Sequence, residues 1–188
     1  MRVTGGKLRG RELRAPKGVK TRPTTEKVRE AWFNILRDVE DARTLELFAG
    51  TGALGIEALS RGARSVVFVE AWAPAQKVLG ENLTRLDLWD RSTLVRARTE
   101  SSSKRLVELA PFDLLLADPP WTDLTRSLAA IGRLLEHDLL EAGARLFVGH
   151  PARHAFTQPL HPDLEQVDQR AWGDSGASLF EWRPPARM

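Results

Sequence analysis

The stretch TLELFAGTGALG, residues Thr44–Gly55, decides the fold of this chain. An apolar run over Leu45–Ala49 leads directly into a GxGxxG motif at Gly50–Gly55, and a helical pattern follows. This order predicts a strand, a tight turn and a helix, with a turn whose backbone can lie against a ligand. Glu70 ends the next apolar run, and a carboxylate there can bind ribose hydroxyls. Nicotinamide dinucleotides and S-adenosylmethionine (SAM) both fit such a crevice.

Length and composition restrict the class of protein. The chain has 188 residues and 42% hydrophobic residues, enough for one α/β domain with a small appendage. No apolar run approaches the roughly 20 residues that span a bilayer, and the first residues form no apolar leader. The absence of cysteine excludes disulfides, thiolate metal ligands and a cysteine nucleophile. We therefore expect a soluble, cytoplasmic monomer without a membrane segment.

Charge is unevenly distributed along the chain. Residues 1–29 carry ten basic and two acidic residues, a net charge of +8, whereas the whole chain is only +3. A basic segment on a mildly acidic domain is typical of proteins that bind a polyanion such as nucleic acid. Four histidines lie late in the chain without a carboxylate cluster at ligand spacing, so no metal site is expected.

Strand and helix patterns alternate after residue 40, which predicts an α/β domain over residues 24–188 behind a basic arm over residues 1–23. A short hairpin within Lys7–Leu13 is expected in the arm. The expected strands are Leu45–Ala49, Ser65–Glu70, Thr93–Ala97, Phe112–Ala117, Ala144–Val148, Leu164–Arg170 and Ala177–Trp182. The expected helices run from Thr24 or Thr25 to about Asp38, over Ala53–Arg61, Pro74–Leu86 and Ser101–Ala110, and over residues 123–140. The turn GDSG before the last strand favours an antiparallel hairpin at the end of a mostly parallel, seven-stranded sheet.

The tetrapeptide Asp118-Pro119-Pro120-Trp121 distinguishes the two cofactors. It follows the fourth expected strand, which should lie beside the first strand and open into the same crevice. Two prolines stiffen the backbone and remove donors, so the carbonyls and the aspartate can accept hydrogen bonds from an exocyclic amine. A tryptophan face can stack on the ring that carries this amine. Hydride transfer has no evident use for such a group, which favours methyl transfer from SAM.

Several motifs resemble one family. The sequence DPPW is similar to the signature of SAM-dependent amino methyltransferases, and LELFAGTGALGIEALSRGA (Leu45–Ala63) resembles the SAM loop of the RsmD family. The segments VTGGKLRGREL (Val3–Leu13) and TRPTTEKVREAWFNIL (Thr21–Leu36) resemble the arm and first helix of that family, and AWGDSGASLF (Ala171–Phe180) its closing hairpin. This resemblance implies a Rossmann-like methyltransferase that modifies the N2 amine of a guanine in small-subunit ribosomal RNA, on naked RNA or in an assembling particle.

The resemblance also implies roles for individual residues. The catalytic group would be Asp118, Pro119, Pro120 and Trp121. The residues expected to hold SAM are Glu46, Phe48, Ala49, Gly50, Thr51, Gly52, Ala53, Gly55, Glu70, Ala71 and Thr99. The residues expected to contact RNA are Lys7, Arg9, Arg11, Arg22 and Thr24. The chain departs from the family at Arg98, which stands where an acidic or amide residue near the adenine is usual, and at Trp72, whose ring could pack on that adenine.

Three other functions remain open from sequence. An amino methyltransferase acting on adenine or cytosine of DNA would share DPPW, although the short basic arm and the lack of a separate recognition domain favour RNA. An NAD-dependent oxidoreductase would share the glycine motif. A non-catalytic RNA-binding module would keep the fold alone and incorporate no methyl group.

Overall fold

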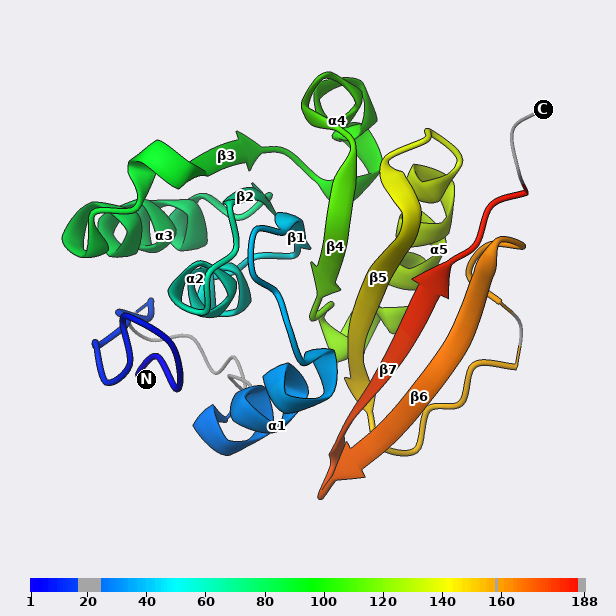
Figure 1. Ribbon diagram of the computed structural model, residues 1–188, viewed down its shortest axis with the longest axis horizontal. Coiled ribbons are helices and arrows are strands. Elements are labelled where there is room, and N and C mark those ends of the chain that lie inside the picture. Colours follow the sequence, from blue (N-terminus) through cyan, green and yellow to red (C-terminus); the bar gives the residue numbers. More distant parts are fainter. Residues whose placement is uncertain (17–24, 158, 186–188) are drawn as a thin grey trace.

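The computed structural model describes residues 1–16, 25–157 and 159–185 (Figure 1). The strands are β1 (Arg43–Leu47), β2 (Ser65–Glu70), β3 (Ser92–Arg96), β4 (Phe112–Ala117), β5 (Leu140–Pro151), β6 (Leu164–Trp172) and β7 (Ser175–Trp182). The α-helices are α1 (Glu26–Leu36), α2 (Ala53–Ser60), α3 (Ala73–Leu86), α4 (Ser103–Leu109) and α5 (Leu124–Leu135). Three short 3-10 helices are η1 (Trp89–Arg91), η2 (Thr99–Ser101) and η3 (Trp121–Asp123).

One seven-stranded sheet runs through the molecule in the order β3-β2-β1-β4-β5-β7-β6. Strands β1 to β5 are parallel to one another, and β7 lies antiparallel between β5 and β6. The expected Rossmann-like architecture is thereby confirmed, including the closing hairpin. The order reverses between β1 and β4, so the loops after these two strands face each other across the switch point.

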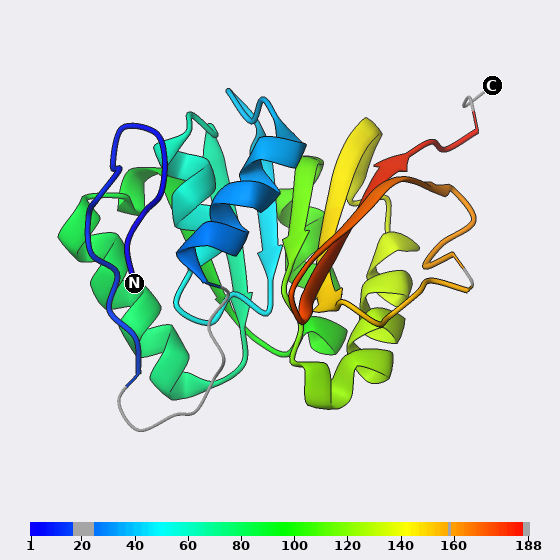
Figure 2. The same cartoon turned by 90° about the horizontal axis from the view of Figure 1, so that it is seen from below.

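Helices cover both faces of the sheet (Figure 2). On one face, α1, α2, α3 and residues from the N-terminus share a core with side chains such as Leu114 and Leu116 of β4. On the other face, α4 and α5 pack against Leu115 and Ala117. Successive side chains of a strand point to opposite faces of the sheet, and both faces are covered here, which explains why the four residues of β4 from Leu114 to Ala117 are all apolar.

The N-terminus forms a hairpin that differs from the expected one. Met1–Val3 pairs with Arg11–Leu13 through backbone bonds, and Lys7 lies in the connecting loop rather than in a strand. Gly6 and Gly10 have φ values of 72° and 82° in this loop, a conformation that glycine adopts at little cost. Burial of Val3 and Leu13 against the core holds the two arms of the hairpin in place.

The largest error in the expected boundaries lies between α5 and β5. The apolar pattern predicts helix through residue 140, but α5 ends at Leu135 and β5 already begins at Leu140. Asp138 between them has a φ of 52°, which a continuing helix does not allow. At the start of the domain, Thr25 caps α1 by accepting a hydrogen bond from the Val28 N–H.

Candidate active site

The loop after β1 makes the turn that the glycine motif predicts. Its backbone is left-handed at every second residue, with φ values of 56° at Phe48, 56° at Gly50 and 77° at Gly52. Glycine tolerates this conformation, but a bulky residue such as Phe48 is strained in it, and such strain is typical of functional loops. Hydrogen bonds from the Ala49 N–H to the Val69 carbonyl and from the Gly52 N–H to the Ala49 carbonyl hold the turn.

Glu46 fixes the helix that follows this loop. Its buried carboxyl group accepts hydrogen bonds from the N–H groups of Leu54 (3.3 Å) and Gly55 (2.9 Å), which would otherwise be unpaired in the first turn of α2. Burial, together with the nearby carboxylates of Glu70 and Asp118, raises the pKa of Glu46 to about 8 despite these two bonds. The structure thus places Glu46 behind the loop, where it orders the start of α2.

Gly55 and Gly50 serve the loop in different ways. A Cβ atom at Gly55 would lie 2.4 Å from Phe68 Cε1 and 2.6 Å from Glu46 Oε2, so only glycine lets α2 approach the sheet this closely. A Cβ atom at Gly50 would meet nothing closer than the Phe48 carbonyl oxygen at 4.0 Å. The backbone at Gly50 therefore faces open space in which a ligand can lie.

Glu70 closes the other side of the loop. Its Oε2 accepts a hydrogen bond from the Gly50 N–H (2.6 Å), and its Oε1 accepts one from the Trp72 N–H (2.7 Å). A carboxylate can accept about four hydrogen bonds, so these two leave capacity for ribose hydroxyls. Ala71 is exposed beside Glu70, and Thr99 is buried in η2, three residues after the Arg96 that pairs with Glu70.

Asp118 emerges from β4 directly beside this loop. Leu47 pairs with Ala117 and Ala117 with Val148, so Asp118 lies between the turn after β1 and Gly149 of β5. A Cβ atom at Gly149 would lie 2.6 Å from Asp118 Oδ1 and 2.5 Å from Trp32 Cη2. The aspartate therefore rests against bare backbone, with the Trp32 ring of α1 as its neighbour.

The remaining catalytic candidates continue from Asp118. Pro119 is buried, Pro120 is exposed and Trp121 is half-buried at the start of η3. Together with the glycine loop and Glu70, they place two kinds of group at the carboxyl ends of β1, β2 and β4: a turn that can receive a nucleoside, and acceptors beside an indole.

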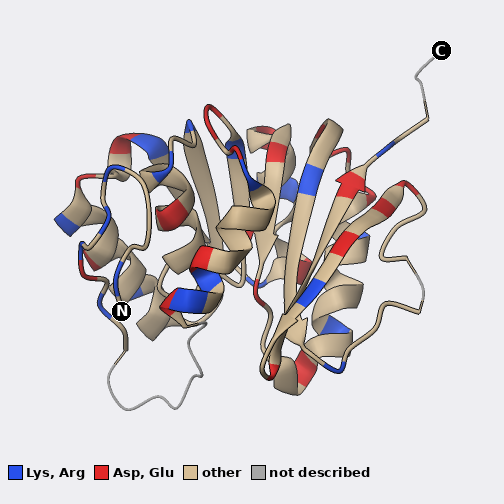
Figure 3. Cartoon of the chain, turned by 60° about the horizontal axis from the view of Figure 1, so that its bottom comes forward, with Lys and Arg blue, Asp and Glu red and all other residues tan. Residues whose placement is uncertain are grey.

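The basic candidates lie on the N-terminal hairpin. Lys7, Arg9 and Arg11 are exposed there, so their charges face solvent. In Figure 3, blue marks Lys and Arg positions along the N-terminal segment. Arg22 and Thr24 fall outside the described residues. No helix within residues 1–16, 25–157 and 159–185 is long and apolar enough to cross a membrane. The same ranges contain no cluster of three His, Asp or Glu side chains suited to a metal ion.

Two buried residues that the sequence analysis did not select join the hairpin to the site. Asn82 of α3 accepts a hydrogen bond from the Arg14 N–H (2.8 Å) and donates to the carbonyls of Arg14 (3.2 Å) and Thr51 (3.1 Å). It therefore connects the hairpin with the glycine loop. Asparagine on a helix gives no sequence signal for this role, because its partners lie 31 and 68 residues away.

Glu57 of α2 binds the other side of the hairpin. Its carboxylate accepts hydrogen bonds from the Thr4 N–H and hydroxyl, the Gly5 N–H, and the side chains of Arg29 and Arg61. Burial acts to raise the pKa of Glu57, but the bonds from Thr4 and Arg61 outweigh it and hold the pKa below its ordinary value. The site and the hairpin are thus fixed to each other through α2 and α3.

Comparisons with known proteins agree with this geometry. The family model described as Conserved hypothetical protein 95 matches residues 1–181. YlbH of Bacillus subtilis, which bears a provisional name as an rRNA methyltransferase, is 33% identical over 97% of this chain and 100% of its own. Ribosomal RNA small subunit methyltransferase D of Haemophilus influenzae is 32% identical over 79% of this chain and 77% of that protein. A solved Escherichia coli structure, yhhF, has a TM-score of 0.81 and 31% identity over 97% and 98% of the two chains.

Proposed function

This chain belongs to the RsmD family, the proteins described as Conserved hypothetical protein 95, and on that premise we propose that it transfers a methyl group from SAM to ribosomal RNA. The acceptor is the N2 amine of a guanine in small-subunit RNA. One observation carries this proposal: the glycine loop after β1 and Asp118 after β4 meet at the switch point of the sheet. The names of the relatives support an RNA substrate, and the resemblance supports guanine N2.

SAM fits the residues at the loop. The open backbone at Gly50 and the remaining acceptor capacity of Glu70 suit a nucleoside with ribose hydroxyls. A solved methyltransferase of the same fold, SMU.776, contains the demethylated product SAH, at 14% identity. SAM would supply an electrophilic methyl group on its sulfonium. Glu46, buried behind the loop, acts by holding α2 rather than by touching the cofactor.

Asp118 and the Pro119 carbonyl orient the acceptor amine. The lone pair of an aromatic amine is delocalised into the ring, which makes the nitrogen a weak nucleophile. Two acceptors fix its hydrogens and stabilise the positive charge that develops on nitrogen during attack. Alignment of the reacting atoms contributes much of the rate. The methylated amine is acidic, so Asp118 does not have to remove a proton before attack.

Trp121 stacks on the target guanine, and the hairpin binds the surrounding phosphates. Lys7, Arg9 and Arg11 are exposed on a hairpin that Glu57 and Asn82 fix beside the site, so the charge lies where a polyanion must approach. The base reaches the buried methyl group by leaving its stack. We expect the cytoplasmic monomer to act on RNA within a small-subunit particle.

Incorporation of labelled methyl from SAM tests the proposal. Purified protein is incubated with small-subunit RNA, both naked and as particles, and separately with DNA, and the modified nucleoside is identified. N2-methylguanosine is the expected product. Methyladenosine or methylcytosine would reject the acceptor, and incorporation only into DNA would reject the RNA substrate.

Asp118→Ala removes the side-chain acceptor, and should lower kcat about a hundredfold or more with little change in SAH affinity. Asp123→Ala, an exposed carboxylate of η3, is the matched control and should retain normal turnover. Equal rates for a folded Asp118→Ala variant and the control would remove Asp118 from the catalytic group.

A further inference from the structure

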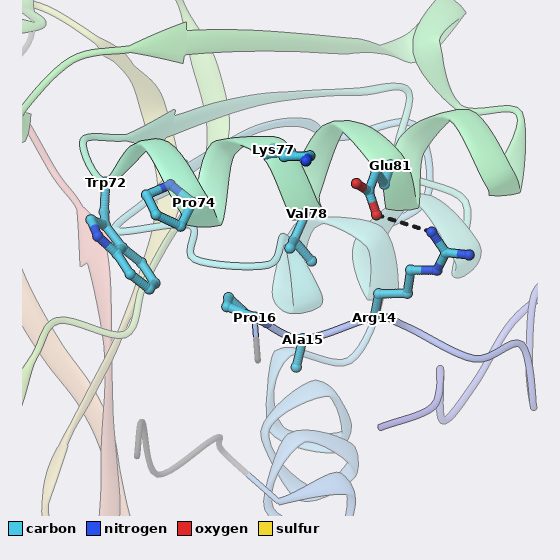
Figure 4. Close-up of a pocket in the computed structure, with 8 residues that line it drawn as sticks. All are labelled: Arg14, Ala15, Pro16, Trp72, Pro74, Lys77, Val78 and Glu81. Carbon is cyan, nitrogen blue, oxygen red and sulfur yellow. Dashed lines mark hydrogen bonds and ion pairs between the residues drawn. The ribbon is translucent and has the colours of Figure 1, made fainter. Parts of the chain in front are cut away.

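A groove of about 770 Å³ lies between α3 and residues Arg14–Pro16 (Figure 4). Both walls are fixed in place. Asn82 holds the backbone of Arg14, and the Arg14 guanidinium pairs with Glu81 of α3 at 3.0 Å. Its size is that of sites that hold small molecules or parts of larger ligands.

Trp72 forms one end of this groove, and no packing role explains the exposed position of its indole. Its side chain is 43% exposed, although it follows a buried strand by only two residues. Figure 4 shows the indole beside Pro74, extending from the start of α3 toward the opposite wall. Among the described residues, no other aromatic ring packs against it. The indole therefore presents a flat apolar surface to the groove.

The groove carries positive charge beside this indole. Lys77 lies one helical turn after Ala73 on the α3 wall, and Arg14 lies on the opposite wall. Glu81 is paired with Arg14, so these two charges offset each other and Lys77 supplies the net positive charge of the lining. Exposed Arg11 approaches the carbonyl of Arg85 and extends the basic strip along α3. An aromatic face with cations along one groove is the pattern by which proteins bind single-stranded nucleic acid, through base stacking and phosphate contacts.

The position of the groove ties it to the candidate active site. Trp72 donates its backbone N–H to Glu70, and Glu70 also binds the glycine loop at Gly50. The groove therefore starts beside the crevice and runs away from it along the hairpin side. Its lining comes from residues 14–16 and 72–81 and includes neither η2 nor the glycine loop, which would surround a cofactor adenine.

Resting on the proposed function, we propose that Trp72 stacks on a base of the substrate RNA next to the target nucleotide. Lys77 and Arg14 contact the phosphates of that single-stranded stretch. The site thus recognises a splayed RNA strand rather than a duplex, and it adds to the substrate contacts of Asp118–Trp121 and the hairpin.

Two tryptophans of equal exposure provide the test. Trp89 is 42% exposed, lies in η1 beyond the far end of α3, and donates its Nε1–H to Thr84 outside the groove. Trp72→Ala, Trp72→Phe and Trp89→Ala are compared with the wild-type chain. Four quantities are measured: the Kd for a single-stranded RNA fragment spanning the modified site, the Kd for SAH, and both kcat and KM, with naked RNA and with particles.

We expect Trp72→Ala to raise the RNA Kd and the KM about tenfold to a hundredfold, the range for one lost base stack, without changing the SAH Kd. Trp72→Phe should recover most of the affinity, and Trp89→Ala should match wild type. Lys77→Ala should reduce the slope of affinity against salt by about one contact.

Other outcomes overturn the inference. A weaker SAH Kd for Trp72→Ala would assign the ring to the cofactor adenine. A higher KM with particles only would assign the groove to a ribosomal protein. Equal values for both alanine variants would leave Trp72 without a ligand role. These failures differ from that of the proposed function, in which the wild-type chain would not methylate RNA.

Discussion

The two faces of the sheet are stabilised by different means. On the face of α1, α2 and α3, the core encloses charged or amide side chains: Arg29, Glu46, Glu57 and Asn82 are all buried. On the face of α4 and α5, the helices pack through leucine, isoleucine and phenylalanine side chains. The first face carries the glycine loop and the hairpin. Polar groups with many partners fix the positions of these segments, whereas apolar packing on the other face supplies stability without directing the site.

The face of α1, α2 and α3 is called the polar face. Glu57→Ala should produce the largest loss of stability on this face. It removes an acceptor of bonds from Thr4, Gly5, Arg29 and Arg61 and leaves the buried Arg29 without its counter-charge. We expect a loss of about 3–5 kcal/mol in the free energy of unfolding, measured in urea. RNA affinity should fall as well, because the hairpin loses its anchor. A loss below about 1 kcal/mol would show that apolar packing alone holds the hairpin.

Ile131→Ala tests the apolar face. This side chain of α5 is fully buried, and its truncation should lower the free energy of unfolding by about 2–5 kcal/mol. Unlike Glu57→Ala, it should leave the Kd values for SAH and RNA unchanged at temperatures where the variant is folded. Loss of RNA affinity in the folded variant would contradict the division between the two faces.

Asn82→Ala should lower the free energy of unfolding by a smaller amount, about 1–3 kcal/mol, because it leaves neutral backbone groups of Arg14 and Thr51 unpaired. Amide hydrogen exchange should accelerate in both residues 12–15 and residues 50–52 if Asn82 connects them. Asn34→Ala, an exposed asparagine of α1, is the control and should alter neither segment. Faster exchange in only one of the two segments would show that Asn82 does not connect them.

Glu46 gives the polar face a pH dependence. Its folded pKa of about 8 lies above the ordinary value of 4.5, so the folded state holds a proton that the unfolded state releases. Stability should therefore fall as pH rises from about 5 to 8, by at most about 1.4 kcal/mol per pH unit, and then level off. Unfolding midpoints across this range should show the decline in wild type and a smaller one in Glu46→Gln. An identical decline in both proteins would assign the pH dependence to groups other than Glu46.

The exposed ion pair of Arg64 and Asp41 should contribute least to the stability of the fold. Both side chains are more than half exposed, so solvent and salt screen their attraction. Arg64→Ala should shift the melting temperature by no measurable amount. A clear drop would mean that surface charge matters here as much as buried charge.

Sequence predicts the parts of this structure that local patterns encode. Continuous apolar runs predict β2 and β4, and the glycine spacing predicts the turn between β1 and α2. The roles of Asn82 and Glu57 could not be predicted, since each depends on partners 28 to 68 residues away that only the fold brings together. The early start of β5 was missed because Leu139 and Leu140 continue the helical apolar pattern past a left-handed residue, Asp138.

The anchoring of the hairpin also has a consequence for folding during synthesis. During synthesis, residues 3–13 leave the ribosome before α2 and α3, whose residues Glu57, Ser60 and Arg85 bind the hairpin. The hairpin can close through its own backbone bonds, but it cannot dock on the domain until α3 has been made as far as Leu86. Because closing so long a loop slows folding, we expect the N-terminal segment to dock late, after the β1–α2–β2–α3 unit has formed.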